Sequence, residues 1–217
     1  MFSLVSLSSD VVTALGVALP LFLIGVLSPG PATLAIMTLS AKSGRRNGLV
    51  FALGVCFGSL FWGTAAAVGL AGLLTLYAGF ISVLKIAGGL YLFWLAFKSL
   101  RSCWERKLPS PSQVPKPRKT LDLFYSGLLL HLLNPKAIFV WLAVVAIGSA
   151  KVSQPSILIN QTMVMVCWSF SVLAFTGYAF LFSTKPIVGL YRRCAKLIDG
   201  LCGMLFAAAG VKILSEH

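Results

Sequence analysis

The stretch VLSPGPA, residues 26–32, interrupts the first long apolar run of the chain, and LLNPKAI, residues 132–138, interrupts a later one. Aligned on each other, the two stretches match Pro29 with Pro135. Proline lacks a backbone N–H and disfavours the helical conformation in the residue before it. Each stretch therefore predicts a break inside an otherwise apolar helix.

The composition identifies the chain as an integral membrane protein. Its 217 residues are 58% hydrophobic and only 11% charged, whereas a soluble domain is about 45–50% apolar. The formal net charge is +13, but the basic residues gather in the short segments between apolar runs, as cytoplasmic loops require. The charge therefore indicates topology, and we expect no nucleic-acid partner.

The apolar runs predict an all-α fold with six membrane spans, the first and fourth of them broken at the proline motifs. A helix needs about 20 apolar residues to cross the bilayer core. Most Lys and Arg residues follow the first, third and fifth spans, which places those segments in the cytoplasm and both termini outside it. The expected spans are about 12–40, 48–74, 80–99, 122–149, 157–182 and 197–214.

A proline-rich basic stretch divides the chain into two halves of three spans each. The first half is residues 1–106, the cytoplasmic linker is 107–120, and the second half is 121–217. An odd number of spans makes the halves insert in opposite directions, so we expect an inverted repeat. KIAGGLYLFWLAFKSL (85–100) also aligns with DGLCGMLFAAAGVKIL (199–214), which matches the third span with the sixth.

We expect the substrate site where the two breaks meet, near the bilayer midplane. A proline leaves a backbone carbonyl without its helical donor, and such a group must face protein, water or a ligand. Freed carbonyls suit an ammonium group, and the N-terminus of the new half-helix suits a carboxylate. The predicted substrate-binding residues are Ser28, Pro29, Gly30, Pro31, Asn134, Pro135 and Lys136.

Four polar residues at the breaks have predicted roles. Ser28 and Asn134 precede the prolines, where their side chains can cap the new half-helix or bind the substrate. Lys136 is a partner for a carboxylate, since an ionisable group at this depth is functional by default. His131 is a candidate for proton coupling because imidazole titrates near physiological pH. A packing role for His131, and simple kinks at the prolines, are the alternatives.

Two features suggest rival interpretations. Cys56 and Cys167 occupy similar places in the two halves, which suggests a membrane thiol-disulfide relay. The G-x-x-x-G motif at 54–58 is either a packing motif within the subunit or the seam of a homodimer. Export of a metal ion or another small metabolite is a further alternative, although no metal site, cofactor or catalytic residue is expected.

Several motifs together resemble the lysine and homoserine exporter family (LysE/RhtB type). They are SPGP in the first span, the glycine ladder from Gly44 to Gly58, AGGLYLFWLAFKSLR at the end of the third span and LLNPKAIFVW in the fourth. The likeness runs over about residues 20–214. Carried over by position, the family's PGP and NPK elements are Pro29, Gly30, Pro31 and Asn134, Pro135, Lys136.

The resemblance implies a secondary exporter rather than an enzyme. It implies a multi-pass protein of the bacterial inner membrane that moves amino acids or their derivatives, driven by the proton gradient. No acidic group is evident inside the membrane, which favours a neutral amino acid over a cationic one. Membrane lipid is the other expected partner.

Overall fold

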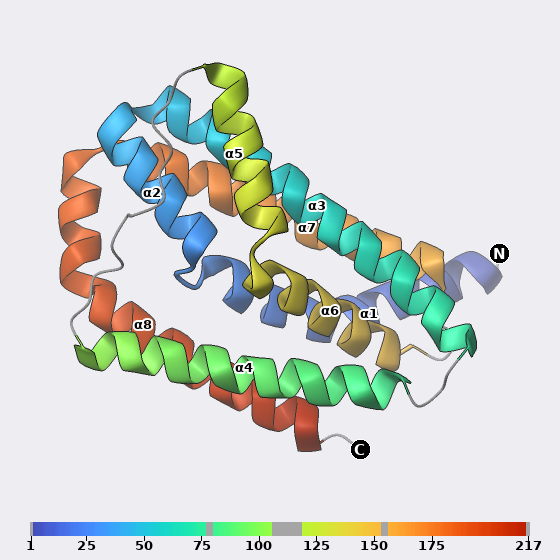
Figure 1. Cartoon of the computed structure of the whole chain (residues 1–217). Coiled ribbons are helices and arrows are strands. Elements are labelled where there is room, and N and C mark those ends of the chain that lie inside the picture. Colours follow the sequence, from blue (N-terminus) through green and yellow to red (C-terminus); the bar gives the residue numbers. More distant parts are fainter. Residues whose placement is uncertain (1, 77–79, 106–118, 153–155, 216–217) are drawn as a thin grey trace.

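The computed structural model describes residues 2–76, 80–105, 119–152 and 156–215, and within these ranges the regular structure is entirely α-helical. Figure 1 shows the helices in sequence colours. They are α1 (Phe2–Leu27), α2 (Pro31–Ser43), α3 (Arg45–Leu76), α4 (Phe80–Glu105), α5 (Thr120–Leu132), α6 (Pro135–Ala150), α7 (Ile157–Leu181) and α8 (Lys185–Ser215).

Three of the described helices are long and apolar enough to cross a membrane. The qualifying segments are Ser9–Leu27, Arg45–Gly69 and Ile157–Leu181, which lie in α1, α3 and α7. The pair α5 and α6 bends by 60° at its break and makes a fourth if it is one span. The chain is therefore an all-helical membrane protein, and the count of six spans stays a prediction.

The ends of two helices differ from the expected spans. α1, which carries the start of the expected span 12–40, begins already at Phe2, and α8, which contains the expected span 197–214, begins at Lys185. Arg192 and Arg193 consequently lie on a helix instead of in a loop, because basic residues are good helix formers. Most of the predicted linker lies outside the described residues.

The predicted breaks are confirmed in both helices. α1 ends at Leu27 and α2 begins at Pro31, while α5 ends at Leu132 and α6 begins at Pro135. Proline stands at the start of each new helix, where its missing N–H costs nothing and its fixed φ suits the helical turn. In Figure 1 the two breaks meet in the middle of the molecule.

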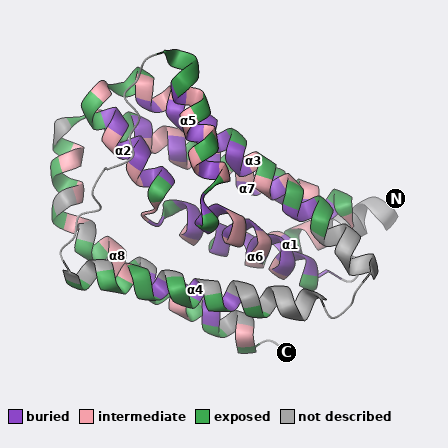
Figure 2. Cartoon of the chain, viewed as in Figure 1, coloured by how far each residue is buried: buried purple, intermediate pink, exposed green. Residues whose placement is uncertain are grey.

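The core lies between six of the helices. α3 and α7 pack on each other, α5 packs on α3, and α1 packs on α6. Figure 2 shows buried residues along these helices and on α2, whereas α4 and α8 carry few of them among the residues described. α4 and α8 pack mainly on each other and meet the rest of the described chain chiefly through α6. The breaks thus lie inside the six-helix core.

Glycines let α3 and α5 approach at backbone contact. A Cβ atom at Gly54 would overlap the carbonyl oxygen of Phe124, and one at Gly127 would overlap that of Phe51. A Cβ at Gly58 would lie 2.9 Å from the Cβ of His131. The G-x-x-x-G motif therefore packs within the subunit, as the first interpretation predicts.

The contacts between α4 and α8 are reciprocal. A Cβ at Gly89 would lie 2.7 Å from Leu214 Cγ, and a Cβ at Gly203 would lie 2.7 Å from Leu100 Cγ. The sequence alignment of the third and sixth spans pairs Gly89 with Gly203 and Leu100 with Leu214. Residues that correspond in the alignment therefore make corresponding contacts.

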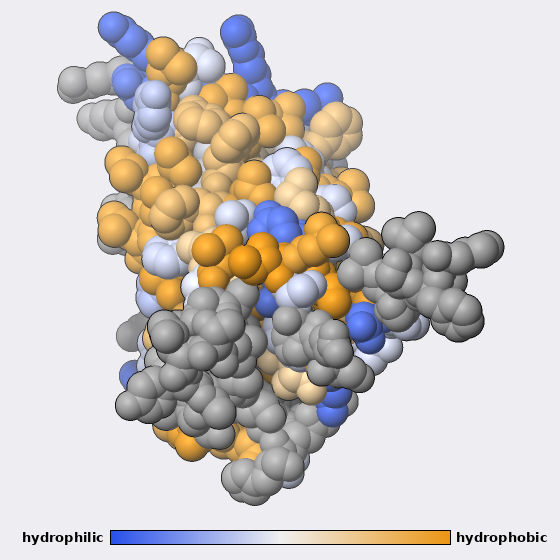
Figure 3. Space-filling model, turned by 90° about the vertical axis from the view of Figure 1, so that its right-hand side faces the viewer, coloured by the Kyte–Doolittle hydropathy of each residue, from blue (hydrophilic) through white to orange (hydrophobic). Residues whose placement is uncertain are grey.

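The outer surface is largely apolar. Apolar side chains cover much of the face in Figure 3, and long hydrophilic side chains project at its upper end. Phe57 and Phe61 on α3 and Leu173 on α7 are among the large exposed apolar residues. A soluble monomer rarely exposes contiguous apolar surface on this scale, so the surface suits contact with lipid.

The close approach of α3 and α5 predicts opposite effects for two glycine substitutions on one helix. Gly54→Ala should lower the melting temperature of the detergent-solubilised protein, since overpacking costs about 1–3 kcal/mol. Gly69→Ala should leave it unchanged or raise it, because no atom of the described residues, apart from the adjoining backbone of α3 itself, lies within 4 Å of a Cβ there, and alanine favours helix by about 1 kcal/mol. Thermal unfolding of both variants measures the difference, and equal melting temperatures would contradict the packing.

Candidate functional site

A buried lysine joins the two broken helices. Lys136 Nζ lies 2.8 Å from the carbonyl oxygen of Ser28 and 2.5 Å from its Oγ. Lys136 is 9% exposed and Ser28 is fully buried. Hydrogen bonds with an ionised partner are about twice as strong as neutral ones. The contact therefore holds the start of α6 against the segment that follows α1.

Gly30 provides the space that Lys136 occupies. A Cβ atom at Gly30 would lie 3.0 Å from Lys136 Nζ and 3.1 Å from its Cδ. The backbone of Gly30 is extended, with φ −155° and ψ 177°, which any residue can adopt. Glycine is therefore needed at this position because a larger side chain would clash with Lys136, and not because of its backbone conformation.

Side chains and turns of the protein satisfy the carbonyls that the prolines free. Ser28 Oγ donates to Gly25 O at 3.0 Å, and Tyr178 donates its hydroxyl to Leu27 O at 2.9 Å. At the second break, the N–H of Asn134 donates to His131 O at 3.1 Å. The freed carbonyls thus face donors of the protein itself, which is one of the expected outcomes. The cation bound at the first break is the ammonium of Lys136.

Only one of the two expected caps forms. Asn134 is the N-cap of α6, and its Oδ1 accepts from the N–H of Lys136 at 3.1 Å. Ser28 does not cap α2, because the second proline of SPGP moves the helix start to Pro31 and makes Gly30 the N-cap. Among the described residues no side-chain hydrogen bond caps α2, so the positive end of its helix dipole, at its first N–H groups, stays available to a ligand.

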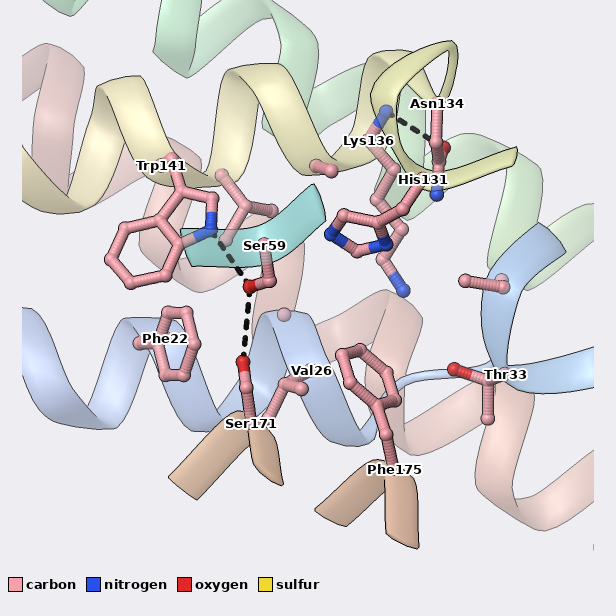
Figure 4. A pocket seen from close by; sticks show the side chains of 15 residues that line it. Phe22, Val26, Thr33, Ser59, His131, Asn134, Lys136, Trp141, Ser171 and Phe175 are labelled. Carbon is pink, nitrogen blue, oxygen red and sulfur yellow. Dashed lines mark hydrogen bonds between the residues drawn. The ribbon is translucent and has the colours of Figure 1, made fainter. Parts of the chain in front are cut away.

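A cavity of about 40 Å³ lies between the two breaks. A water needs about 10–15 Å³ of such space, so the cavity has room for a few waters or a small polar group. Figure 4 shows its lining side chains converging from several helices. The polar side chains of its lining are Thr33, Ser59, His131, Asn134, Lys136 and Ser171, and the other lining residues are Phe22, Gly25, Val26, Gly30, Ala32, Ala137, Val140, Trp141 and Phe175.

The other predicted site residues contribute to the breaks and not to the cavity wall. Pro31 and Pro135 are exposed at the start of their helices, and Pro29 is half-buried. Ser28 reaches the site through Lys136. The structure therefore brings Gly30, His131, Asn134 and Lys136 to one cavity and places the three prolines around it.

His131 is a buried imidazole without a hydrogen-bond partner. The side chain is 5% exposed, and neither ring nitrogen has a partner among the described residues. Its ring meets the ring of Phe175 edge to face, with centroids 5.8 Å apart. Buried polar atoms are nearly always paired, so two open nitrogens on a cavity wall indicate that a water or ligand belongs there.

Two serines on the cavity wall are not singled out by the sequence. Ser59 and Ser171 are 2% and 0% exposed, and Trp141 donates its Nε1–H to Ser59 Oγ at 3.1 Å. Small residues such as serine are frequent where membrane helices pack, so nothing in the sequence separates these two from packing residues. Their only signal is position, which requires the fold.

The two cysteines of the thiol hypothesis lie in the core. Cys56 is 1% and Cys167 is 0% exposed, and both are free thiols. They belong to α3 and α7, and neither is among the cavity-lining residues. The site at the breaks is therefore built without them.

Comparison with known proteins identifies relatives over nearly the whole chain. The threonine efflux protein of Escherichia coli K12 is 28% identical over 200 residues, which cover 88% of this chain and 93% of that protein. The leucine efflux protein of Enterobacter sp. strain 638 is 28% identical, with 88% and 90% covered. An uncharacterized membrane protein of Pseudomonas aeruginosa is 31% identical, with 87% and 88% covered.

No solved structure matches the chain significantly. The model of the LysE type translocator family matches residues 23–217, which include both breaks and all the residues that line the cavity except Phe22. The chain therefore belongs to the LysE family of translocators.

Proposed function

We propose that this translocator exports amino acids and that the cavity between the two breaks widens to bind one of them. The observation that carries the proposal is the buried ammonium of Lys136, which lines this cavity inside the membrane core. Relatives over most of the chain are named as threonine and leucine efflux proteins. An intramembrane cation in a transporter is expected at the substrate or ion path.

The substrate carboxylate binds between Lys136 and the start of α2. Ala32 and Thr33, in the first turn of α2, line the cavity and are 4% and 3% exposed. Since no side chain caps this helix, its first N–H groups and its dipole favour an anion. Lys136 adds the full charge that pairs with a carboxylate.

The substrate amino group faces His131. A neutral imidazole presents an acceptor nitrogen, and both ring nitrogens of His131 are open. The described residues that line the cavity include Lys136 but no Asp or Glu. This charge balance supports a neutral amino acid over a cationic one, because the second positive charge of a cationic side chain would be unpaired in the cavity.

The proposed fold has six spans arranged as two inverted halves, residues 1–106 and 121–217. The reciprocal contacts of Gly89 with Leu214 and of Gly203 with Leu100 support it, as do the matching breaks. α4 and α8 are then the third and sixth spans, and the basic residues place both termini outside the cytoplasm of a bacterial inner membrane. Rearrangement of the halves around the breaks opens the site outward.

Export is driven by protons that enter as the substrate leaves, and His131 is the proposed carrier of the proton. It is the titratable group beside Lys136 on the cavity wall. Its open nitrogens can exchange a proton with a water or with the substrate. The imidazole thus links occupancy of the cavity to the proton gradient.

The proposal is tested with purified protein in proteoliposomes loaded with a panel of labelled amino acids. Lys136→Ala should reduce efflux at least about ten-fold, because it removes hydrogen bonds to a charged group. Lys42→Ala, at an exposed lysine in the last turn of α2, is the matched control. Efflux by Lys136→Ala at the wild-type rate, or no amino acid moved by the wild type, would refute the proposal.

Proton coupling is tested with His131→Gln, which keeps hydrogen-bonding atoms and removes titration. An acidic external medium should accelerate efflux by the wild-type protein, since protons then enter down their gradient. The variant should lose this response. Efflux rates measured with and without the pH gradient decide the matter, and equal acceleration of both proteins would exclude His131 as the coupling group.

The thiol relay is separated from export by the double variant Cys56→Ala and Cys167→Ala. Efflux should persist, because neither thiol lines the cavity. Size-exclusion chromatography of the variant in detergent serves as the folding control. Loss of efflux from a well-folded double variant would favour the thiol relay.

A further inference from the structure

Two buried serine hydroxyls face each other on the cavity wall. Ser59 of α3 and Ser171 of α7 lie with their Oγ atoms 3.1 Å apart, and either can be the donor. Both side chains line the cavity. In Figure 4 the pair lies on the far side of His131 from the Lys136 ammonium.

Trp141 fixes the orientation of Ser59. Its Nε1–H donates to Ser59 Oγ at 3.1 Å, and its ring packs against Phe22 with centroids 4.7 Å apart. A Cβ at Gly63 would lie 3.1 Å from the ring of Trp141. The indole therefore has little freedom, and one lone pair of Ser59 is committed to it.

The serine pair has unused hydrogen-bonding capacity. Each hydroxyl has one proton and two lone pairs. The bond between the serines uses one of the two protons, and the structure assigns the other no acceptor among the described residues. A lone pair of Ser171 is also open. Because buried polar groups are normally paired, this end of the cavity is suited to a polar group of a ligand.

The surroundings make the pair selective. Phe22, Val26, Val140 and Phe175 supply apolar wall to the same cavity. A purely apolar pocket discriminates weakly against an isostere that carries a hydroxyl, whereas a site with hydrogen-bonding groups rejects the analogue that lacks the hydroxyl. The serine pair thus turns an apolar pocket into one that distinguishes OH from CH3.

The order of polar groups along the cavity suits an amino acid. The Lys136 ammonium and the serine pair lie on opposite sides of His131 in Figure 4. An amino acid with its carboxylate at Lys136 and its amino group at His131 would therefore direct its side chain toward the serines. This step rests on the proposed amino acid export.

We propose that Ser59 and Ser171 form the side-chain subsite of the transporter and determine its specificity. They favour a substrate whose side chain carries a hydroxyl over the isosteric alkyl side chain. Threonine and valine are the matched pair, since they differ by OH against CH3. Trp141 acts as a positioning residue that holds Ser59 toward the cavity.

The test compares Vmax/KM for threonine and valine in proteoliposome counterflow. The wild-type protein should prefer threonine, and the threonine-to-valine ratio should fall about 3- to 10-fold in Ser59→Ala or Ser171→Ala, the effect of one net hydrogen bond. Ser169→Ala is the control on the same helix as Ser171, because its exposed hydroxyl donates to Val166 O at 2.6 Å and does not line the cavity. This variant should keep the wild-type ratio.

Two results would overturn the assignment. One is a wild-type ratio at or below one, which needs no variant and does not depend on whether a variant folds. The other is an unchanged ratio in both serine variants that elute as folded protein. If either result is found while the protein still transports other amino acids, only the serine subsite is refuted and the proposed export stands. If the wild-type protein moves no amino acid, the export proposal itself is refuted.

Discussion

The bond between Lys136 and Ser28 is the interaction on which the site depends. An ammonium buried in a membrane core is costly unless its protons are paired, and two oxygens of one residue accept from it. The pairing is available only because α1 ends at Leu27 and leaves the next carbonyl outside the helical ladder. The break after α1 therefore supplies the acceptor oxygens, and Lys136 supplies the donor that satisfies them.

This interaction also divides the cavity. With Lys136 tied at one end, the positive groups lie together there, and the hydroxyls of Ser59 and Ser171 are left near Trp141. His131 lies between the two ends in Figure 4. The cavity therefore has charge at one end, an imidazole in the middle and hydroxyls at the other end. The carboxylate, amino group and side chain of an amino acid can follow the same order.

The sequence predicts the parts of this arrangement that proline and charge determine. Both breaks, the cap by Asn134 and the packing of Gly54 within the subunit follow from local rules of proline, asparagine and glycine. Ser59 and Ser171 could not be chosen in this way, because only tertiary packing decides which serine of a membrane helix faces a cavity. α8 extends beyond the expected span of 197–214 for a related reason: basic residues mark a membrane boundary but do not end a helix.

The two breaks differ in one respect, since α6 starts with a side-chain cap and α2 does not. At α6 the side chain of Asn134 already occupies the N–H of Lys136, whereas Gly30 brings no side chain to the start of α2. An anion at the start of α6 would have to displace this cap, and a cap is worth about 1 kcal/mol relative to alanine. The two breaks are therefore unequal as anion sites, and the start of α2 is the one that an anion can occupy without breaking a side-chain hydrogen bond.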